Sequence, residues 1–89
     1  MPRAEISWDR RTEDGQKVRI YAQHFGDRWH FFVREARYDQ RQPLEHPPLD
    51  DWLELLDGVQ RRVGRGLFRP TEVTRVKQAI RERFPDAEI

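Results

Sequence analysis

The chain has 89 residues and a formal net charge of +1, and 37% of its residues are charged, against about 25% in an average globular domain. It contains no cysteine, which excludes disulfide bonds, thiolate metal ligands and a cysteine nucleophile. No apolar run approaches the roughly 20 residues that cross a membrane, and the first residues lack the apolar stretch of a secretory signal. We therefore expect one cytoplasmic domain over residues 1–89 that has no membrane partner.

Three segments in the first half of the chain alternate apolar and polar residues, which is the period of a half-buried β-strand. They centre on Trp8, Ile20 and Phe31. Each of the two loops between them contains a glycine, which suits a hairpin turn. Counting outward from the turns places Trp8 opposite Ile20 and Ala22 opposite Phe31. Because a slip of one residue would move each set to the other face, the agreement between the two hairpins supports this register.

The second half of the chain has helical periodicity. Apolar residues recur at helical spacing from Leu49 to Val63, with Leu55 widening the stripe, and Gly64 and Gly66 are expected to end this helix. The three prolines at positions 43, 47 and 48 separate this helical half from the strands.

A second helix is expected from about Pro70 or Thr71 to Arg83. Thr71 is the predicted N-cap, and a proline two residues after Arg83 prevents the helix from continuing. Leu67 and Phe68, in the connection between the helices, are expected to pack under the second helix.

A sheet with one apolar face needs a cover, and two amphipathic helices can provide it. The sequence predicts an α+β fold of two layers in the order βββαα. A three-stranded antiparallel sheet at about residues 4–40 carries two C-terminal helices, at about residues 48–84, on one face. The pattern leaves open whether residues 40–48 add a fourth strand. The predicted inward residues are Ile6, Trp8, Val18, Ile20, Ala22, Trp29, Phe31, Val33, Trp52, Leu53, Leu56, Val59, Val63, Phe68, Val76 and Ile80.

The predicted register leaves a second set of side chains on the opposite face of the sheet, with Tyr21 directly across from Phe32. Aromatic rings flanked by arginines can stack unpaired nucleic-acid bases. The same two rings can instead stabilise the sheet or form a contact between two copies of the chain. The binding candidates on this face are Arg19, Tyr21, His30, Phe32 and Arg34, with Tyr38 a further member at the end of the third strand.

The connection between the helices, residues 61–69, interleaves four arginines with two glycines. Guanidinium and backbone N–H groups bind phosphate, and the following helix would add its positive N-terminal end. The alternative is structural, because glycines end helices and basic residues in a last turn interact favourably with the helix dipole. Residues 61–83 carry eight basic residues against two acidic ones. The candidates for anion or nucleic-acid binding are Arg61, Arg62, Arg65, Arg69, Arg75 and Lys77.

No group of residues indicates catalysis. The first helix carries an acidic stripe of Asp50, Glu54 and Asp57, which we expect to be solvated. The three histidines lack the spacing of metal ligands, and the only serine, Ser7, has no partner arranged as a catalytic base. We therefore expect a non-enzymatic interaction module without cofactor or metal, which binds a protein partner or a second copy of itself. The alternative is a nucleic-acid-binding accessory protein that uses the Arg/Gly-rich loop.

Overall fold

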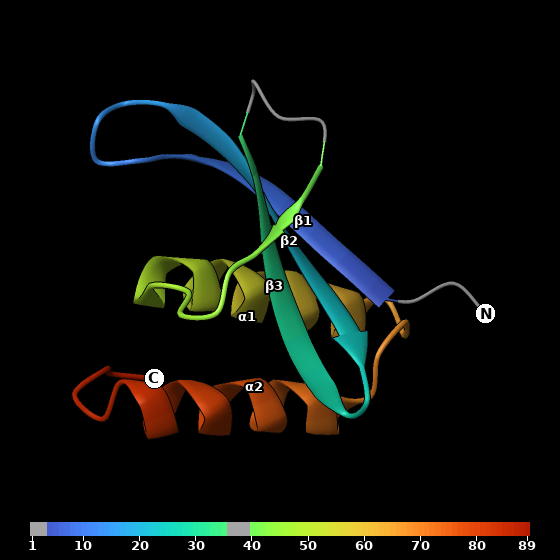
Figure 1. Ribbon diagram of the computed structural model, residues 1–89. Helices are drawn as coiled ribbons and strands as arrows, with labels where there is room; N and C mark the ends of the chain where they lie inside the picture. The colour runs from blue at the N-terminus through green and yellow to red at the C-terminus, as the bar shows by residue number, and fades with distance from the viewer. Residues whose placement is uncertain (1–3, 36–39) are drawn as a thin grey trace. The chain divides into compact units, whose positions relative to one another are not determined.

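The structure is a computed structural model that describes residues 4–35 and 40–89. It divides into two compact units, residues 1–47 and residues 48–89, and the boundary falls between Pro47 and Pro48. The first unit contains the strands and the second contains the helices (Figure 1). In chain order the elements are β1 (Ala4–Arg11), β2 (Lys17–Phe25), β3 (Arg28–Glu35), β4 (Gln42–Pro43), α1 (Leu49–Gly64) and α2 (Pro70–Arg83). The predicted α+β class is confirmed.

The sheet has the strand order β1-β2-β3-β4, and all its neighbouring strands are antiparallel. The predicted register is confirmed: Trp8 lies opposite Ile20, Ala22 opposite Phe31, and Tyr21 opposite Phe32. The three predicted strands are present, and Gln42–Pro43 adds a very short fourth strand, a possibility that the sequence left open for residues 40–48.

The fourth strand has two residues and contains Pro43, which lies opposite Phe32. The neighbouring Phe31 carbonyl accepts a hydrogen bond from the Leu44 N–H at 2.9 Å, so Phe31 directs its backbone groups toward β4. Backbone direction alternates along an antiparallel ladder, so Pro43 occupies a position that needs no N–H toward β3.

Both hairpin turns use left-handed backbone. Gly15 has φ of +85°, and its N–H donates to the Thr12 carbonyl at 2.9 Å. In the second turn both central residues, Gly26 and Asp27, have positive φ, at 60° and 61°. Positive φ at both positions is the requirement of a type I′ turn, whose twist matches that of the flanking strands.

The apolar face of the sheet follows the predicted alternation. Trp8 is half-buried and packs edge-to-face against Phe31, with ring centroids 6.2 Å apart. Trp29 and Val33 are also half-buried. The fully buried members of this face are Ile6, Val18, Ile20, Ala22 and Phe31.

Helix α1 buries a stripe that differs by one residue from the predicted one. Leu55 is fully buried, whereas Leu53, predicted to point inward, is 37% exposed. At about 100° per residue, the buried positions of α1 centre between Leu55 and Val59, and Leu53 lies roughly 140° around the helix from that direction, toward solvent. Asp51 is also fully buried, which the sequence did not indicate.

Helix α2 begins two residues earlier than its predicted cap implies, although Pro70 was one of its two predicted first residues. Arg69 is the N-cap and Pro70 occupies the first turn, where its missing N–H costs nothing, so the prediction of Thr71 as N-cap was wrong. Val76 and Ile80 are buried as predicted. The two helices contact each other, and the Arg83 guanidinium lies 4.8 Å from the centre of the Trp52 ring.

The connection between the helices was predicted to bury both of its apolar residues, and this was half wrong. Leu67 is 65% exposed, while Phe68 is half-buried. Leu67 follows Gly66, whose φ of +76° reverses the chain at the end of α1.

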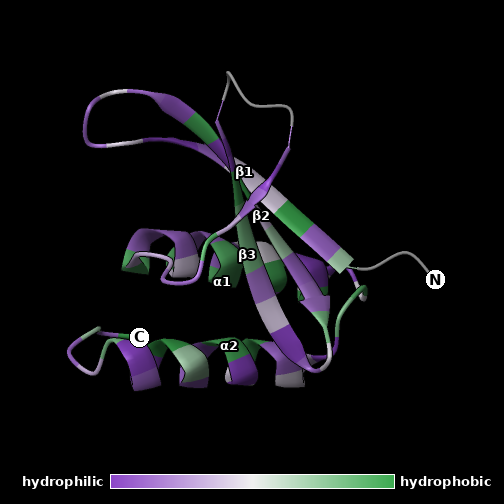
Figure 2. Cartoon of the chain, in the orientation of Figure 1, coloured by the Kyte–Doolittle hydropathy of each residue, from purple (hydrophilic) through white to green (hydrophobic). Residues whose placement is uncertain are grey.

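Figure 2 shows apolar and polar segments alternating along both helices. Among the described residues, no helix has the length and apolar character needed to cross a membrane.

Candidate functional site

The polar face of the sheet gathers more cations than carboxylates. By the observed register, the odd-numbered residues of β1 and β2 and the even-numbered residues of β3 share this face. We call it the polar sheet face, and it includes Arg41, which lies over the Tyr21 ring. Its six cationic residues against two carboxylates leave an excess of four positive charges. The charged members are Glu5, Asp9, Arg11, Lys17, Arg19, Arg28, Arg34 and Arg41.

Tyr21 was expected to be an exposed aromatic on this face, and that expectation was wrong. It is only 7% exposed, because the Arg41 guanidinium stacks on its ring at 3.6 Å from the centroid. The Arg19 guanidinium also lies over the same ring, 5.9 Å from the centroid. Tyr21 is therefore a platform for arginine side chains, an arrangement that cation–π attraction favours.

Glu5 holds Arg41 in this position. Its Oε1 accepts hydrogen bonds from Gln23 Nε2 at 2.9 Å and from Arg41 Nη1 at 2.5 Å. Gln23 is the register partner of Glu5, whereas Arg41 is 36 residues away along the chain. The Gln23 amide, together with the Arg41 guanidinium, holds the pKa of the Glu5 carboxyl below its ordinary value, although partial burial acts in the opposite direction.

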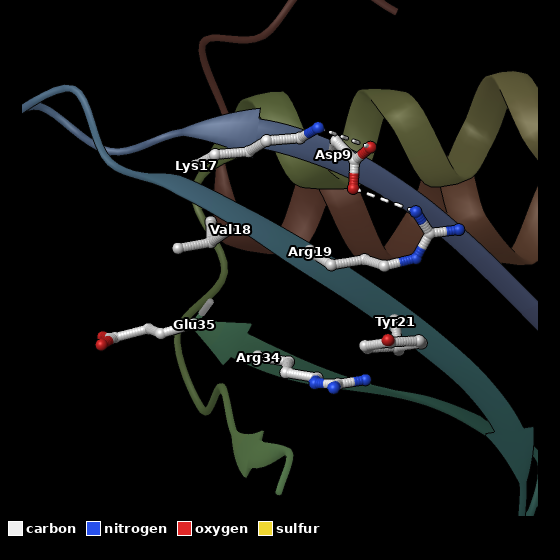
Figure 3. A pocket seen from close by; sticks show the side chains of 7 residues that line it. All are labelled: Asp9, Lys17, Val18, Arg19, Tyr21, Arg34 and Glu35. Carbon is white, nitrogen blue, oxygen red and sulfur yellow. Dashed lines mark hydrogen bonds and ion pairs between the residues drawn. The ribbon is translucent and has the colours of Figure 1, made fainter. Parts of the chain in front are cut away.

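A pocket of about 210 Å³ lies at one end of the same face (Figure 3). Asp9 forms ion pairs there with Arg19 at 3.0 Å and with Lys17 at 3.8 Å. Arg19 also donates to Ser7 Oγ at 3.1 Å, so its guanidinium is held on the β1 side of the pocket. The residues that line the pocket are Asp9, Lys17, Val18, Arg19, Tyr21, Arg34 and Glu35.

Arg34 borders the pocket on β3, directly opposite Arg19 in the register. Figure 3 shows the two arginine side chains on either side of the pocket, both on the same face as Tyr21. Like charges directly opposite each other in a sheet are destabilising unless an anion lies near both. Asp9 supplies that anion for Arg19.

The other two sheet candidates do not join this pocket. The His30 ring stacks on Phe25 with centroids 3.8 Å apart, and its Nε2 lies 3.2 Å from the Phe25 carbonyl oxygen, a contact in which a ring N–H donates. Phe32 is half-buried beside Pro43 of β4. Tyr38 lies outside the described residues. Of the five sheet candidates, the structure thus brings together Arg19, Tyr21 and Arg34.

The Arg/Gly-rich loop uses its backbone to end α1. The N–H of Gly66 donates to the Val63 carbonyl at 3.0 Å, and the N–H of Leu67 donates to the Arg62 carbonyl at 2.8 Å. With Gly66 in the left-handed region, these two bonds define a Schellman motif. The backbone N–H groups of Arg65, Gly66 and Leu67 are therefore already used, and Gly64 is the last residue of the helix, not part of its stop.

The six basic candidates of the second unit make separate local contacts. Arg61 forms an ion pair with Asp57 at 3.2 Å, and Arg62 donates to the Gly58 carbonyl at 3.2 Å. Arg75 forms an ion pair with Glu72 at 3.3 Å. Of the rest, Arg65 and Arg69 are exposed at the two ends of the loop, and Lys77 is half-buried on α2.

The acidic stripe of α1 is solvated as expected, with Asp50, Glu54 and Asp57 all exposed. Within residues 4–35 and 40–89, no group of three or more histidine, aspartate or glutamate side chains is arranged to hold a metal ion.

Several residues of the site were not among the sequence candidates: Glu5 and Arg41 beside Tyr21, and Asp9, Lys17, Val18 and Glu35 in the pocket. The predicted register could have placed Glu5 opposite Gln23, but no pattern in the sequence places Arg41 over Tyr21.

Comparisons of the chain with protein-family models, with curated proteins and with solved structures found no match.

Proposed function

We propose that the chain is a small non-enzymatic interaction module that binds an acidic segment of a partner protein on its polar sheet face. The observation that carries this proposal is the Arg19–Arg34 pair, which stands on the two sides of a pocket with the Tyr21 ring beside it. A cytoplasmic location and the absence of a cofactor belong to the same proposal.

The Arg19–Arg34 pair supports the binding of a carboxylate. Two guanidinium groups on facing strands repel each other, and an anion between them relieves that repulsion while accepting hydrogen bonds from both. Asp9 already engages Arg19 from the β1 side, so an incoming carboxylate would approach the pair from the β3 side of the pocket.

The charge pattern favours a protein partner over a nucleic acid. Glu5 and Asp9 lie among the cations and would repel a continuous phosphate backbone, whereas a protein segment can place both signs of charge opposite them. Stacking a base on Tyr21 would also require the displacement of Arg41, which is tied to Glu5. Glu5 and Asp9 form ion pairs with Arg41 and Arg19. This role supports a binding function and not proton transfer by the carboxylates.

The test is the binding of a fluorescein-labelled, glutamate-rich peptide, followed by anisotropy at about 50 mM and about 150 mM salt. A peptide with glutamine in place of glutamate is the control ligand. We expect the Arg34→Ala variant to weaken binding about tenfold, since it removes one charge-assisted contact.

The matched control variant is Arg28→Ala, which removes one exposed cation from the far end of the same face. An equal loss in both variants would show a general charge effect and would contradict the pocket as the site. Labelled single-stranded and duplex oligonucleotides test the alternative proposal, nucleic-acid binding by the Arg/Gly-rich loop, for which Arg65 and Arg69 are the exposed cations. Oligonucleotide binding that Arg65→Ala and Arg69→Ala together abolish, with no peptide binding, would replace the first proposal with the second.

A further inference from the structure

The two edges of the sheet are protected to different degrees. On one side the sheet ends at β4, which has two residues and contains Pro43. A short edge strand with a proline cannot template a further strand. On the other side it ends at β1, which has eight residues, no proline, and β2 as its only strand partner among the described residues. The open edge is therefore that of β1.

Backbone direction along β1 follows from the hairpin that leads into β2. The Thr12 N–H donates to the Gln16 carbonyl at 2.8 Å, which makes these two residues a hydrogen-bonded pair. Such pairs alternate along an antiparallel ladder, so the even-numbered residues of β1 direct their backbone groups toward β2. The odd-numbered residues, from Glu5 to Arg11, direct theirs toward the open edge.

We propose that β1 pairs antiparallel with β1 of a second copy of this chain, across a two-fold axis at Trp8, so that the two sheets become continuous. In this register Glu5 lies opposite Arg11 of the second copy, and Ser7 lies opposite Asp9 of the second copy. All of these residues are odd-numbered, so each can exchange backbone hydrogen bonds with its partner. The symmetry repeats the Glu5–Arg11 pair twice in each dimer.

Charge complementarity selects this register over its neighbours. Moving the axis one residue toward Ser7 places Glu5 opposite Asp9, and moving it one residue toward Asp9 places the two Asp9 side chains opposite each other. Both arrangements put like charges face to face, which is destabilising. Of these three registers, only the one with its axis at Trp8 brings opposite charges together. An axis at Arg10 would also pair Asp9 with Arg11, but it would leave only the last three residues of β1 paired.

Glu5 can accept the additional contact. Gln23 and Arg41 both donate to its Oε1, and no described residue donates to Oε2. Arg11 is exposed, and within the described part of the chain its side chain makes one hydrogen bond, from Nη1 to the Gly15 carbonyl at 3.0 Å. Its other guanidinium donors can therefore reach across to Glu5 of the second copy.

The experiment is sedimentation velocity on the full chain from micromolar to millimolar concentration. We expect a monomer–dimer equilibrium for the natural sequence. Ser7→Pro removes an N–H that points away from β2, and we expect it to be monomeric at every concentration. The matched control is Ser7→Ala, which loses the contact with Arg19 but keeps the N–H, and it should dimerise like the natural chain.

A second pair of variants tests the register without touching the backbone. Arg11→Glu places two glutamates opposite each other twice per dimer, and we expect the dimer dissociation constant to rise about tenfold. Arg28→Glu makes the same charge change at an exposed position of β3 and should leave the constant within about twofold. Far-ultraviolet circular dichroism identifies any variant that fails to fold. If Ser7→Pro does not fold, the Arg11→Glu result alone tests the proposal.

A natural chain that is monomeric at every concentration would overturn the proposal. So would a dimer that is as tight in folded Arg11→Glu as in the natural chain. Peptide binding on the polar sheet face is measured separately, so the two proposals can fail independently.

Discussion

Tyr21 shows how a single neighbouring side chain changes what a residue can do. Its place in the alternation of β2 indicates an exposed ring, and its register opposite Phe32 is the predicted one. Arg41 nevertheless covers it, because Glu5 fixes the guanidinium from the other side. Three side chains from distant points of the chain thus form one unit, and Glu5 is its only anion.

The first residue-scale prediction concerns Glu5. Its pKa is lowered in the folded protein, so its ionised form stabilises the fold above the unfolded pKa, and this contribution disappears as the pH falls through the folded pKa. We expect Glu5→Gln to reduce the free energy of unfolding at neutral pH by less than about 1 kcal/mol, because the pair is screened by solvent. The cost should vanish in acid.

Urea unfolding at pH 7 and at about pH 3 measures this difference. Glu13→Gln is the control, since Glu13 is an exposed carboxylate in the first hairpin loop. If Glu5→Gln were equally costly at both pH values, the stabilisation would come from the shape of the side chain and not from its charge.

At the scale of elements, the end of α1 is the clearest case of local sequence deciding structure. Two glycines stand close together, yet only Gly66 has positive φ, while Gly64 completes the helix. Both have open space where a Cβ would lie, so a methyl group added at either position meets no neighbour. The two positions differ in backbone conformation alone.

We therefore expect opposite effects from the same substitution. Gly66→Ala forces a side chain into the left-handed region and should lower the free energy of unfolding by about 1 kcal/mol. Gly64→Ala replaces a helical glycine with a better helix former and should raise it by up to about 1 kcal/mol. Thermal and urea unfolding of the two variants test this directly, and a change of the same sign in both would contradict the assignment of the Schellman motif.

The elements also show where sequence periodicity was sufficient to predict strand register and burial, and where it was not. The register of β1, β2 and β3 could be predicted because two short turns fix which residues face each other. The pairing of β4 could not, because it depends on the course of the chain after β3, where no short turn sets the count. Likewise, periodicity could not predict that Leu55 is buried and Leu53 is exposed. Both residues fit the helical period, one on each side of the apolar stripe.

At the scale of the whole molecule, the charges are distributed differently from what the linear sequence indicates. The basic segment at residues 61–83 suggested a cationic surface, but the whole of residues 48–89 carries eight basic and eight acidic residues. Ion pairs such as Arg61–Asp57 join the basic segment to the acidic stripe before it. The excess of cations lies instead on the polar sheet face.

Size supports the expectation of a single domain, although the chain divides into two compact units. Each unit has fewer than 50 residues and no disulfide, which is close to the lower limit for independent folding. We expect residues 1–47 and residues 48–89 to be unfolded as separate fragments, and the full chain to unfold in one transition that tryptophan fluorescence and circular dichroism report at the same temperature. A fragment with a cooperative transition of its own would show two domains.

The sequence by itself determined the types of the main elements, the register of the first three strands and the positions of the turns, because alternation, helical spacing and glycine conformation act between residues that are near in the chain. Only the tertiary structure decided that Arg41 covers Tyr21, that Glu5 holds it there, and that Arg19 and Arg34 share a pocket. Those contacts join residues up to 36 positions apart, and no local pattern determines which distant cation comes to rest on a given ring.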